Sequence, residues 1–360
     1  MKRLSKVIKD NKIYVILAVF LVCMNILSLL VDRMPQDDRV GQEAVTQEAE
    51  VFPEARMFSS TDSVKREEQL KRLALENPRL YAFVGLVNLV IFFLIFVGFL
   101  IDVYLIVRFA RGKGFELKIN FSKTPRWTIG DVIRAILIFM SCGYVVSVGQ
   151  SFFADLIPVL YNENFRMVFN TAMINLIGIS VIFHFVVKKY GHTIADMGLT
   201  MKKFAKGVSI AAVSYVSLLP VLVVIMVFTF YVAKWLNYDP PIQPIVRLFM
   251  EEKCTGILWL SVLFAAIFGP VAEEIFFRGF MYPALRKKIG STFAIILTAV
   301  IFAGLHAHIV GFLPIVVLGI LLTYLYEKTG SLVSSITVHI LHNVAMVGLV
   351  FLVKNVGFQN

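Results

Sequence analysis

The sequence is poor in charged residues, in cysteine and in long hydrophilic stretches. Only 16% of its 360 residues are Asp, Glu, Lys or Arg, whereas 58% are hydrophobic, a balance that excludes a soluble globular protein of this size. The three cysteines, Cys23, Cys142 and Cys254, are far apart and lie in or beside apolar runs. They therefore indicate neither a disulfide framework nor a cysteine metal site. No internal repeat and no low-complexity segment is visible.

Apolar runs close to twenty residues in length fill most of the chain. Such a run is long enough to cross the hydrocarbon core of a bilayer as an α-helix. The sequence therefore predicts an all-α, polytopic transmembrane helix bundle with about eight or nine spans. The shortest predicted span is the eighth, and if it or its hairpin partner were re-entrant the C-terminus would change sides. The nine predicted spans are Ile13–Val31, Leu80–Val107, Val132–Gly149, Met167–Val187, Val208–Ala233, Gly256–Phe277, Thr292–Val310, Phe312–Tyr326 and Leu332–Val353.

The distribution of basic residues predicts the orientation in the cell membrane. The formal net charge of +11 could by itself suggest a nucleic-acid partner. Lys and Arg concentrate in alternate loops, however, as orientation signals do, so we expect a lipid bilayer and no nucleic acid. The N-terminus is predicted to be cytoplasmic. The first run is too long for a signal peptide and no cleavage site follows it, so we interpret it as an uncleaved span.

Three regions follow from this pattern. Residues 1–79 are predicted to hold the first span and an extracytoplasmic loop, Asp32–Arg79, in which Ser63–Glu76 could form a surface helix. Residues 80–250 form an N-terminal transmembrane bundle, and a short interfacial helix is possible at Gln243–Glu252. Residues 251–353 form a core in which the polar motifs stand.

Two adjacent carboxylates and an arginine, Glu273, Glu274 and Arg278, stand in an apolar run. Ionisable side chains are costly at membrane depth and therefore mark a functional site by default. Glu274 and Arg278 are four residues apart on one helix face, so we predict an ion pair between them. Glu273 then points about 100° away and is free for chemistry. Pro270 lacks an N–H group and is expected to free a backbone carbonyl and to kink the helix.

Four histidines lie in the last part of the chain. Counted from a predicted helix end at Gly290, Glu273 and His306 lie at similar depth on antiparallel helices, roughly 25 Å from the turn at about 1.5 Å per residue. His339 and Asn343 share a face of the last span and can approach the same layer. We predict that Glu273 acts as a general base, that His306 shares a water with it, and that the other two stabilise an oxyanion. Supporting or incidental roles are expected for His308 and His342.

The ordered set of motifs resembles the CPBP family of intramembrane proteases. This family includes the type II CAAX prenyl endopeptidases and bacterial proteins linked to bacteriocin processing and self-immunity. The resemblance covers about Glu251–Val353, under a third of the chain. The matching motifs are Glu273-Glu274-x-x-x-Arg278, Phe302-x-x-x-His306 and His339-x-x-x-Asn343, and the segment Tyr326–Leu332 is similar to the family's approach to the third motif.

The resemblance implies roles for the motif residues and raises the question of a metal. It implies that Glu273 and His306 activate a water, that Glu274 and Arg278 hold the geometry, and that His339 and Asn343 stabilise the oxyanion. Members of the family have often been described as metalloproteases. The sequence has no His-Glu-x-x-His helix, although Glu273, His306 and His339 could form a three-ligand zinc site. We favour metal-free glutamate chemistry, with zinc as the alternative.

The sequence thus predicts an intramembrane endopeptidase that cuts a membrane-associated or lipid-anchored peptide or protein. A bacterial peptide precursor, a pheromone, a membrane-anchored protein and a CAAX-like tail are all compatible substrates. The alternative is a non-catalytic immunity or scaffold protein that binds a peptide in the same cavity. An ion- or proton-coupled transporter ranks lower, because no inverted repeat is visible and the polar groups cluster in one third of the chain.

Overall fold

The structure is a computed structural model that describes residues 11–31, 71, 74–112, 125–201 and 204–356. Helices account for nearly all of these residues, and no strand occurs among them. The all-α class predicted from the apolar runs is confirmed. Most of the hydrophilic stretch Asp32–Arg79, with the surface helix proposed at Ser63–Glu76, lies outside the described residues.

Seven helical segments are long and apolar enough to cross a membrane, and the protein is a multi-pass membrane protein. They are α5 (Pro78–Ala110), α6 (Ile129–Phe153), α7 with η2 (Glu163–Phe183 and His184–Lys189), α8 (Phe204–Trp235), the run from α10 to α12 (Thr255–Ile289), α14 (Ile309–Thr329) and α15 (Leu332–Val356). Two shorter apolar helices occupy the remaining predicted spans, α2 (Lys12–Val31) and α13 (Ser291–Gly304). Short helices lie between them, namely η1 (Pro158–Tyr161), η3 (Ile194–Met197) and α9 (Pro244–Glu251), the last as predicted.

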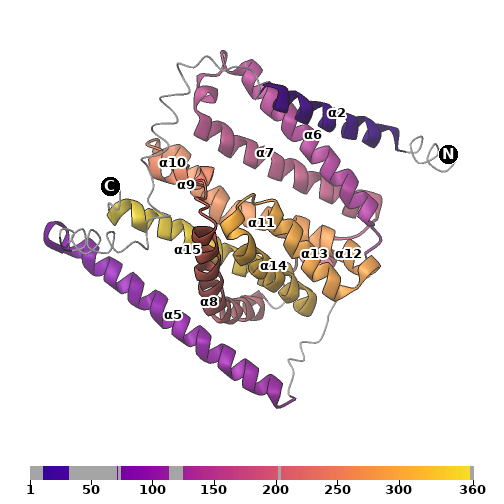
Figure 1. Cartoon of the computed structure of the whole chain (residues 1–360). Coiled ribbons are helices and arrows are strands. Elements are labelled where there is room, and N and C mark those ends of the chain that lie inside the picture. The colour runs from indigo at the N-terminus through magenta and orange to yellow at the C-terminus, as the bar shows by residue number, and fades with distance from the viewer. Residues whose placement is uncertain (1–10, 32–70, 72–73, 113–124, 202–203, 357–360) are drawn as a thin grey trace.

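The helices pack so that the motif-bearing segments lie at the centre. In Figure 1, α2 runs along α6, which pairs with α7, while α5 packs on α8 at the opposite side. The α10 to α12 run, α13, α14 and α15 lie between these two groups. α8 also contacts α14 and α15, and α7 contacts α11. Helices of the N-terminal region therefore flank the predicted core on two sides.

The sixth span is longer than predicted. The helical run Thr255–Ile289 continues past Phe277, where the prediction ended it, so the carboxylates stand in its middle. Arg278 does not end the helix because Glu274 neutralises its charge inside the bundle. The run comprises α10 (Thr255–Leu263), η4 (Phe264–Phe268), α11 (Gly269–Glu274), η5 (Ile275–Met281) and α12 (Tyr282–Ile289). The segments η4 and η5 are π-helical, a wider form that is rare and often found at functional sites.

The break between α13 and α14 also differs from the prediction. The predicted spans meet at Gly311, whereas the chain turns at residues 305–308 and α14 starts at Ile309. His308 explains the early start, because its ring Nδ1 accepts a hydrogen bond from the Gly311 N–H (2.8 Å) and caps the helix. The eighth span is therefore a full 21-residue helix. His306, which we expected on a span, lies in the connection.

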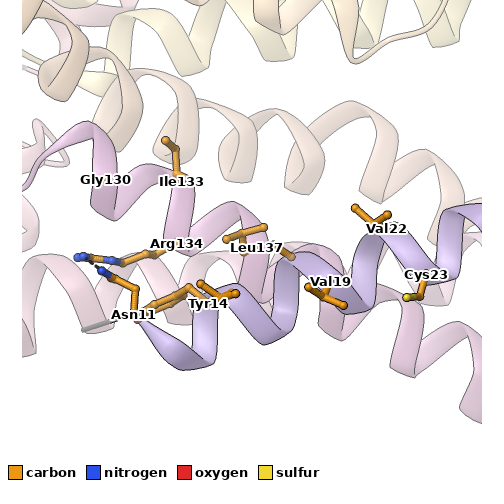
Figure 2. A pocket seen from close by; sticks show the side chains of 11 residues that line it. Asn11, Tyr14, Val19, Val22, Cys23, Gly130, Ile133, Arg134 and Leu137 are labelled. Atoms are coloured by element: carbon orange, nitrogen blue, oxygen red, sulfur yellow. Dashed lines mark hydrogen bonds between the residues drawn. The ribbon is translucent and has the colours of Figure 1, made fainter. Parts of the chain in front are cut away.

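Arg134 fixes the first helix against α6. It donates to Asn11 (2.8 Å), pairs with Asp131 (3.1 Å) and stands 5.3 Å over the ring of Tyr14, instead of extending freely to the interface. An open, mainly apolar groove of about 570 Å³ lies beside these contacts, between α2 and α6 (Figure 2). Its lining comes from these two helices and Asn11, so the groove is separate from the motif residues.

A buried polar cluster joins the adjacent ends of α6 and α7. Asp131 accepts hydrogen bonds from Lys189 (2.6 Å) and from the hydroxyl of Tyr190 (2.6 Å). Burial, together with this bond to Asp131, raises the pKa of Tyr190. His192 is buried, with its ring at an edge-to-face angle to Trp127 and the ring centres 5.4 Å apart. The loop after α7 is therefore packed onto the bundle.

Candidate active site

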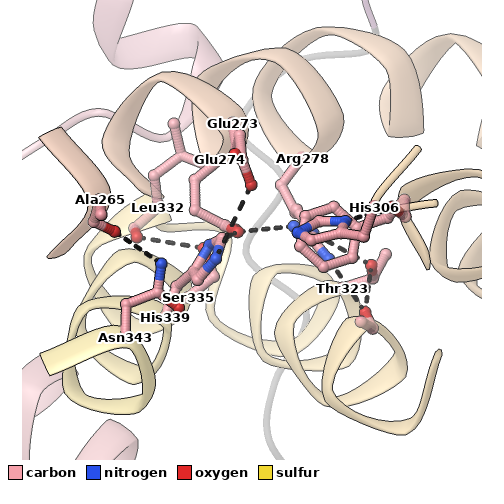
Figure 3. Close-up of polar contacts among 12 residues, drawn as sticks. Ala265, Glu273, Glu274, Arg278, His306, Thr323, Leu332, Ser335, His339 and Asn343 are labelled. Atoms are coloured by element: carbon pink, nitrogen blue, oxygen red, sulfur yellow. Dashed lines mark hydrogen bonds and ion pairs between the residues drawn. The ribbon is translucent and has the colours of Figure 1, made fainter. Parts of the chain in front are cut away.

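Glu274 and Arg278 form the predicted ion pair, one turn apart on the central helical run (Figure 3). Glu274 Oε1 lies 2.5 Å from Arg278 Nη1, and both side chains are 0% exposed. The remaining guanidinium nitrogens donate to Thr323 Oγ1 (3.3 Å) and to the Gly319 carbonyl (3.2 Å) of α14. The guanidinium carbon is 4.6 Å from the ring centre of Phe302 on α13. A buried charge needs such pairing, and here the pairing joins three helices, while Glu274 Oε2 accepts no hydrogen bond from the described residues.

The close approach of α13 and α14 depends on Gly319. A Cβ atom at this position would lie 3.1 Å from both Cα and Cβ of Ala299, tighter than an ordinary contact. The absent side chain lets the Gly319 carbonyl reach Arg278.

His339 of α15 connects the two glutamates. Its Nδ1 is 2.9 Å from Glu274 Oε1, and its Nε2 is 3.8 Å from Glu273 Oε2. An ionised carboxylate only accepts hydrogen bonds, so Nδ1 carries a hydrogen. The ring is buried, with its edge 5.5 Å from the ring centre of Phe302. His339 is thus held in one orientation, with Nε2 facing Glu273.

Glu273 has surroundings unlike those of its neighbour. Its side chain is 35% exposed and lines a cavity of about 290 Å³. Its Oε2 atom is buried and accepts no hydrogen bond from the residues that the structure describes. This oxygen faces His339 Nε2 at 3.8 Å, and the exposed part of the carboxylate lines the cavity, where it can act as a base.

His306 lines the same cavity as Glu273. Its Nδ1 lies 2.8 Å from the carbonyl oxygen of Phe302. A carbonyl oxygen only accepts, so Nδ1 carries the hydrogen, and in the neutral ring Nε2 is left with a lone pair. Apart from Glu273, His306 and Asn175, the lining is apolar.

Asn343 of α15 hydrogen-bonds the backbone of the central run. Its Nδ2 donates to the carbonyl of Ala265 (2.8 Å), and neither Asn343 nor His339 lines the cavity. In η4 the Gly269 N–H bonds the carbonyl of Phe264, five residues back. In the same register, the carbonyl of Ala265 would accept a hydrogen bond from the N–H of residue 270. Residue 270 is a proline and has no N–H. Pro270 therefore frees a carbonyl, as predicted, and α15 supplies the missing donor.

Glu327 is a further buried glutamate near the end of α14. It accepts from the hydroxyl of Tyr282 (2.7 Å) and pairs with Arg286 (2.9 Å), both on α12. The neighbouring Tyr326 donates its hydroxyl to the carbonyl of Met197 (2.9 Å). The segment Tyr326–Leu332, which resembles the family's approach to the third motif, therefore joins α14 to α12 and to η3.

Sequence reasoning missed two polar residues of the site. Thr323 contacts Arg278, and Asn175 lines the cavity. Neither belongs to a motif, and a lone Thr or Asn in an apolar span ordinarily indicates only a hydrogen bond between helices. Thr323 and Gly319 lie one turn apart on α14, and this spacing is the one local hint that they share a partner. The sequence does not reveal that the partner is Arg278, because Arg278 lies on another helix.

The donor groups do not fit a metal ion in this arrangement. Within the described parts of the chain, no group of three His, Cys, Asp or Glu side chains lies close enough to hold one. Of the three predicted zinc ligands, His339 already directs both ring nitrogens at carboxylates. We therefore assign no step to a metal.

Residues 255–345 match the family model described as type II CAAX prenyl endopeptidase Rce1-like. The similarity covers about a quarter of the chain. It starts at α10, ends within α15 and contains all three motifs, so the resemblance of the motifs is confirmed. A Bacillus subtilis (strain 168) protein named "Putative membrane peptidase YdiL" is 32% identical over 88 residues, which cover 24% of this chain and 36% of that protein. No solved structure matches the chain.

Proposed function

We propose that this protein is an intramembrane endopeptidase in which Glu273 activates a water molecule. The observation that carries the proposal is the partly exposed Glu273 side chain, which lines a cavity together with His306 inside a membrane helix bundle. The match to the Rce1-like family model and the printed name of the Bacillus subtilis relative support a peptidase.

The proposed reaction follows from these two side chains. Glu273 and the Nε2 atom of His306 accept hydrogen bonds from one water. Glu273 takes a proton as the water oxygen bonds to the scissile carbonyl carbon, which gives a tetrahedral oxyanion. The C–N bond then breaks, and Glu273 returns the proton to the leaving nitrogen. One water is consumed and two peptide ends are formed.

The other motif residues support this step. Glu274 and Arg278 hold the geometry, and Glu274 orients the ring of His339. With Nε2 also protonated, His339 can donate to the oxyanion, and the two glutamates stabilise the imidazolium. Asn343 uses one amide hydrogen on Ala265 and keeps a second for the oxyanion.

The proposed substrate is a peptide or protein held in or anchored to the membrane. The cavity opens among apolar helices, where such a substrate resides. The alternative, a non-catalytic immunity or scaffold protein, is not favoured. Such a protein has no need of a partly exposed glutamate beside a histidine in its binding cavity.

The test compares peptides released by cells that produce wild type or Glu273→Ala at equal membrane levels, by mass spectrometry of membrane and medium. We expect a fragment that only wild type releases. Identical fragments, with a binding or resistance phenotype retained, would move the assignment to the non-catalytic alternative. Dialysis of wild-type membranes against a chelator should leave the release unchanged. Loss of release that added zinc restores would favour the zinc site.

A further inference from the structure

We propose that Asn175 of α7 binds the backbone of the substrate peptide, and that the helix face around it forms a binding wall of the cavity. This inference rests on the proposed function. It extends the site beyond the residues that match the Rce1-like model, because α7 precedes residue 255.

One face of α7 lines the cavity. Asn175, Gly178, Ile179 and Ile182 are spaced three and four residues apart, so they project to the same side of the helix. Glu273 and Phe276 line the cavity from the central run, which contacts α7 along α11 and η5. A peptide in the cavity would therefore contact the base and α7 together.

Asn175 is the polar group of this wall, and no described residue hydrogen-bonds to its amide. In the same bundle the amides of Asn25, Asn343 and Asn355 each donate to a backbone carbonyl, whereas Asn170 of α7, away from the cavity, has a buried Oδ1 without a described partner. An amide at membrane depth is costly unless it finds a partner. The position of Asn175 on the cavity wall makes a bound peptide the natural partner.

The chemistry of the amide selects an extended peptide. In apolar surroundings every backbone N–H and C=O needs a hydrogen bond, and a helix satisfies them internally. An unwound segment at a cleavage site leaves its N–H and C=O groups without these internal hydrogen bonds. The Asn side chain offers both a donor and an acceptor, so it can serve the C=O and the N–H of a peptide backbone.

Space for such a segment lies beside the amide. A Cβ atom added at Gly178, one turn from Asn175, would meet nothing within 4 Å. The cavity volume of about 290 Å³ is close to the lower end of ligand sites, roughly 300 Å³. It therefore suits a short stretch of peptide around the cut bond, with the rest of the substrate outside.

The experiment compares Asn175→Ala with a matched control, Asn170→Ala, which removes the same side chain from the same helix away from the cavity. The probe is the precursor peptide whose fragment distinguishes wild type from Glu273→Ala, synthesised with a fluorophore and a quencher across the cut bond. We expect KM to rise about tenfold in Asn175→Ala, the effect of one lost hydrogen bond, with kcat nearly unchanged. Asn170→Ala should leave KM unchanged.

A second measurement separates binding from cleavage. Glu273→Gln should retain the uncut probe during purification, and Glu273→Gln with Asn175→Ala should lose it. Gly178→Leu, which fills the adjacent space and leaves the amide intact, should also raise KM. It keeps the proposal testable if Asn175→Ala fails to reach the membrane.

The outcomes distinguish the two proposals. Unchanged KM and unchanged probe retention in the Asn175 variants would overturn the binding role while cleavage by wild type stands. A fall in kcat at constant KM would overturn it as well, because it would indicate a structural role. Identical fragments from wild type and Glu273→Ala would remove the proposed function, and the binding role with it.

Discussion

At the scale of residues, two adjacent glutamates differ because of what surrounds them. Glu274 is enclosed and receives Arg278 and His339 on one oxygen, whereas the side chain of Glu273 is 35% exposed and lines a cavity. The i, i+4 spacing alone predicted which of the two would be paired. Burial with partners fixes Glu274 as a support, and partial exposure leaves Glu273 for chemistry.

The buried pair should be needed for stability. Arg278→Met leaves the charge of Glu274 inside the bundle without its main partner, and removal of one member of a buried pair costs about 3–5 kcal/mol. We expect this loss in the free energy of unfolding, measured by denaturation in detergent. Glu274→Leu combined with Arg278→Met should recover part of it, because both charges are gone.

A matched control is Arg134→Met, which removes a partly exposed arginine from its pair with Asp131. Asp131 is buried but keeps its hydrogen bonds from Lys189 and Tyr190 in this variant, so the loss should be clearly smaller. Equal losses in the two arginine variants would contradict the importance assigned to burial.

At the scale of elements, the central helical run owes its shape to two other segments of the chain. Asn343 of α15 bonds the Ala265 carbonyl in η4, and the indole of Trp127 bonds the Phe280 carbonyl in η5 (2.8 Å). Each π-helical segment is thus held by a side chain from outside the run. The geometry around Glu273 is therefore a property of several packed elements.

Pro270 and Asn343 should be energetically coupled. Asn343→Leu leaves the Ala265 carbonyl without its donor, which should cost about 1–3 kcal/mol. Pro270→Ala supplies an N–H at the position that the register requires, so Asn343→Leu should cost less in that background. Unfolding free energies of wild type, both single variants and the double variant measure the coupling. Strictly additive losses would show that the proline does not create the need for the asparagine.

The elements were largely predictable from the sequence, and their irregularities were not. Among the described residues, apolar run length located a helix for each of the nine predicted spans, and the rise per residue placed Glu273 and His306 beside one cavity. The break at residues 305–308 depends on a cap by His308, and π-helical turns leave no periodic signal. The Ala265 carbonyl that Asn343 bonds lies on a helix distant in sequence, so spacing within the motif could not reveal it.

At the scale of the whole molecule, the bundle places the residues that match the Rce1-like model between helices that the family model does not cover. α7 contributes to the cavity wall, and α8 contacts α14 and α15. These flanking helices come from the region 80–250, so we expect substrate choice to depend on residues outside the matched domain.

The predicted orientation can be tested with the protein's own cysteine. Cys254 is exposed between α9 and α10, in a loop that we predict to be external. With Cys23→Ala and Cys142→Ala in place, a membrane-impermeant maleimide should label Cys254 in intact cells. In a second chain with Cys254→Ala, Lys288→Cys at the exposed end of α12 should react only after permeabilisation. The reverse pattern would place the N-terminus outside.

The contribution of α15 has a consequence for biosynthesis. His339 and the donor for the Ala265 carbonyl both come from this helix, which is made after every other described part of the site. At about 5–20 residues per second, Asn343 follows Glu273 from the ribosome by roughly 4–14 seconds. During that interval the nascent chain contains Glu273 and Glu274 but lacks His339, the histidine that lies between them in the folded protein. We therefore expect the proposed peptidase to be inactive until α15 has joined the bundle.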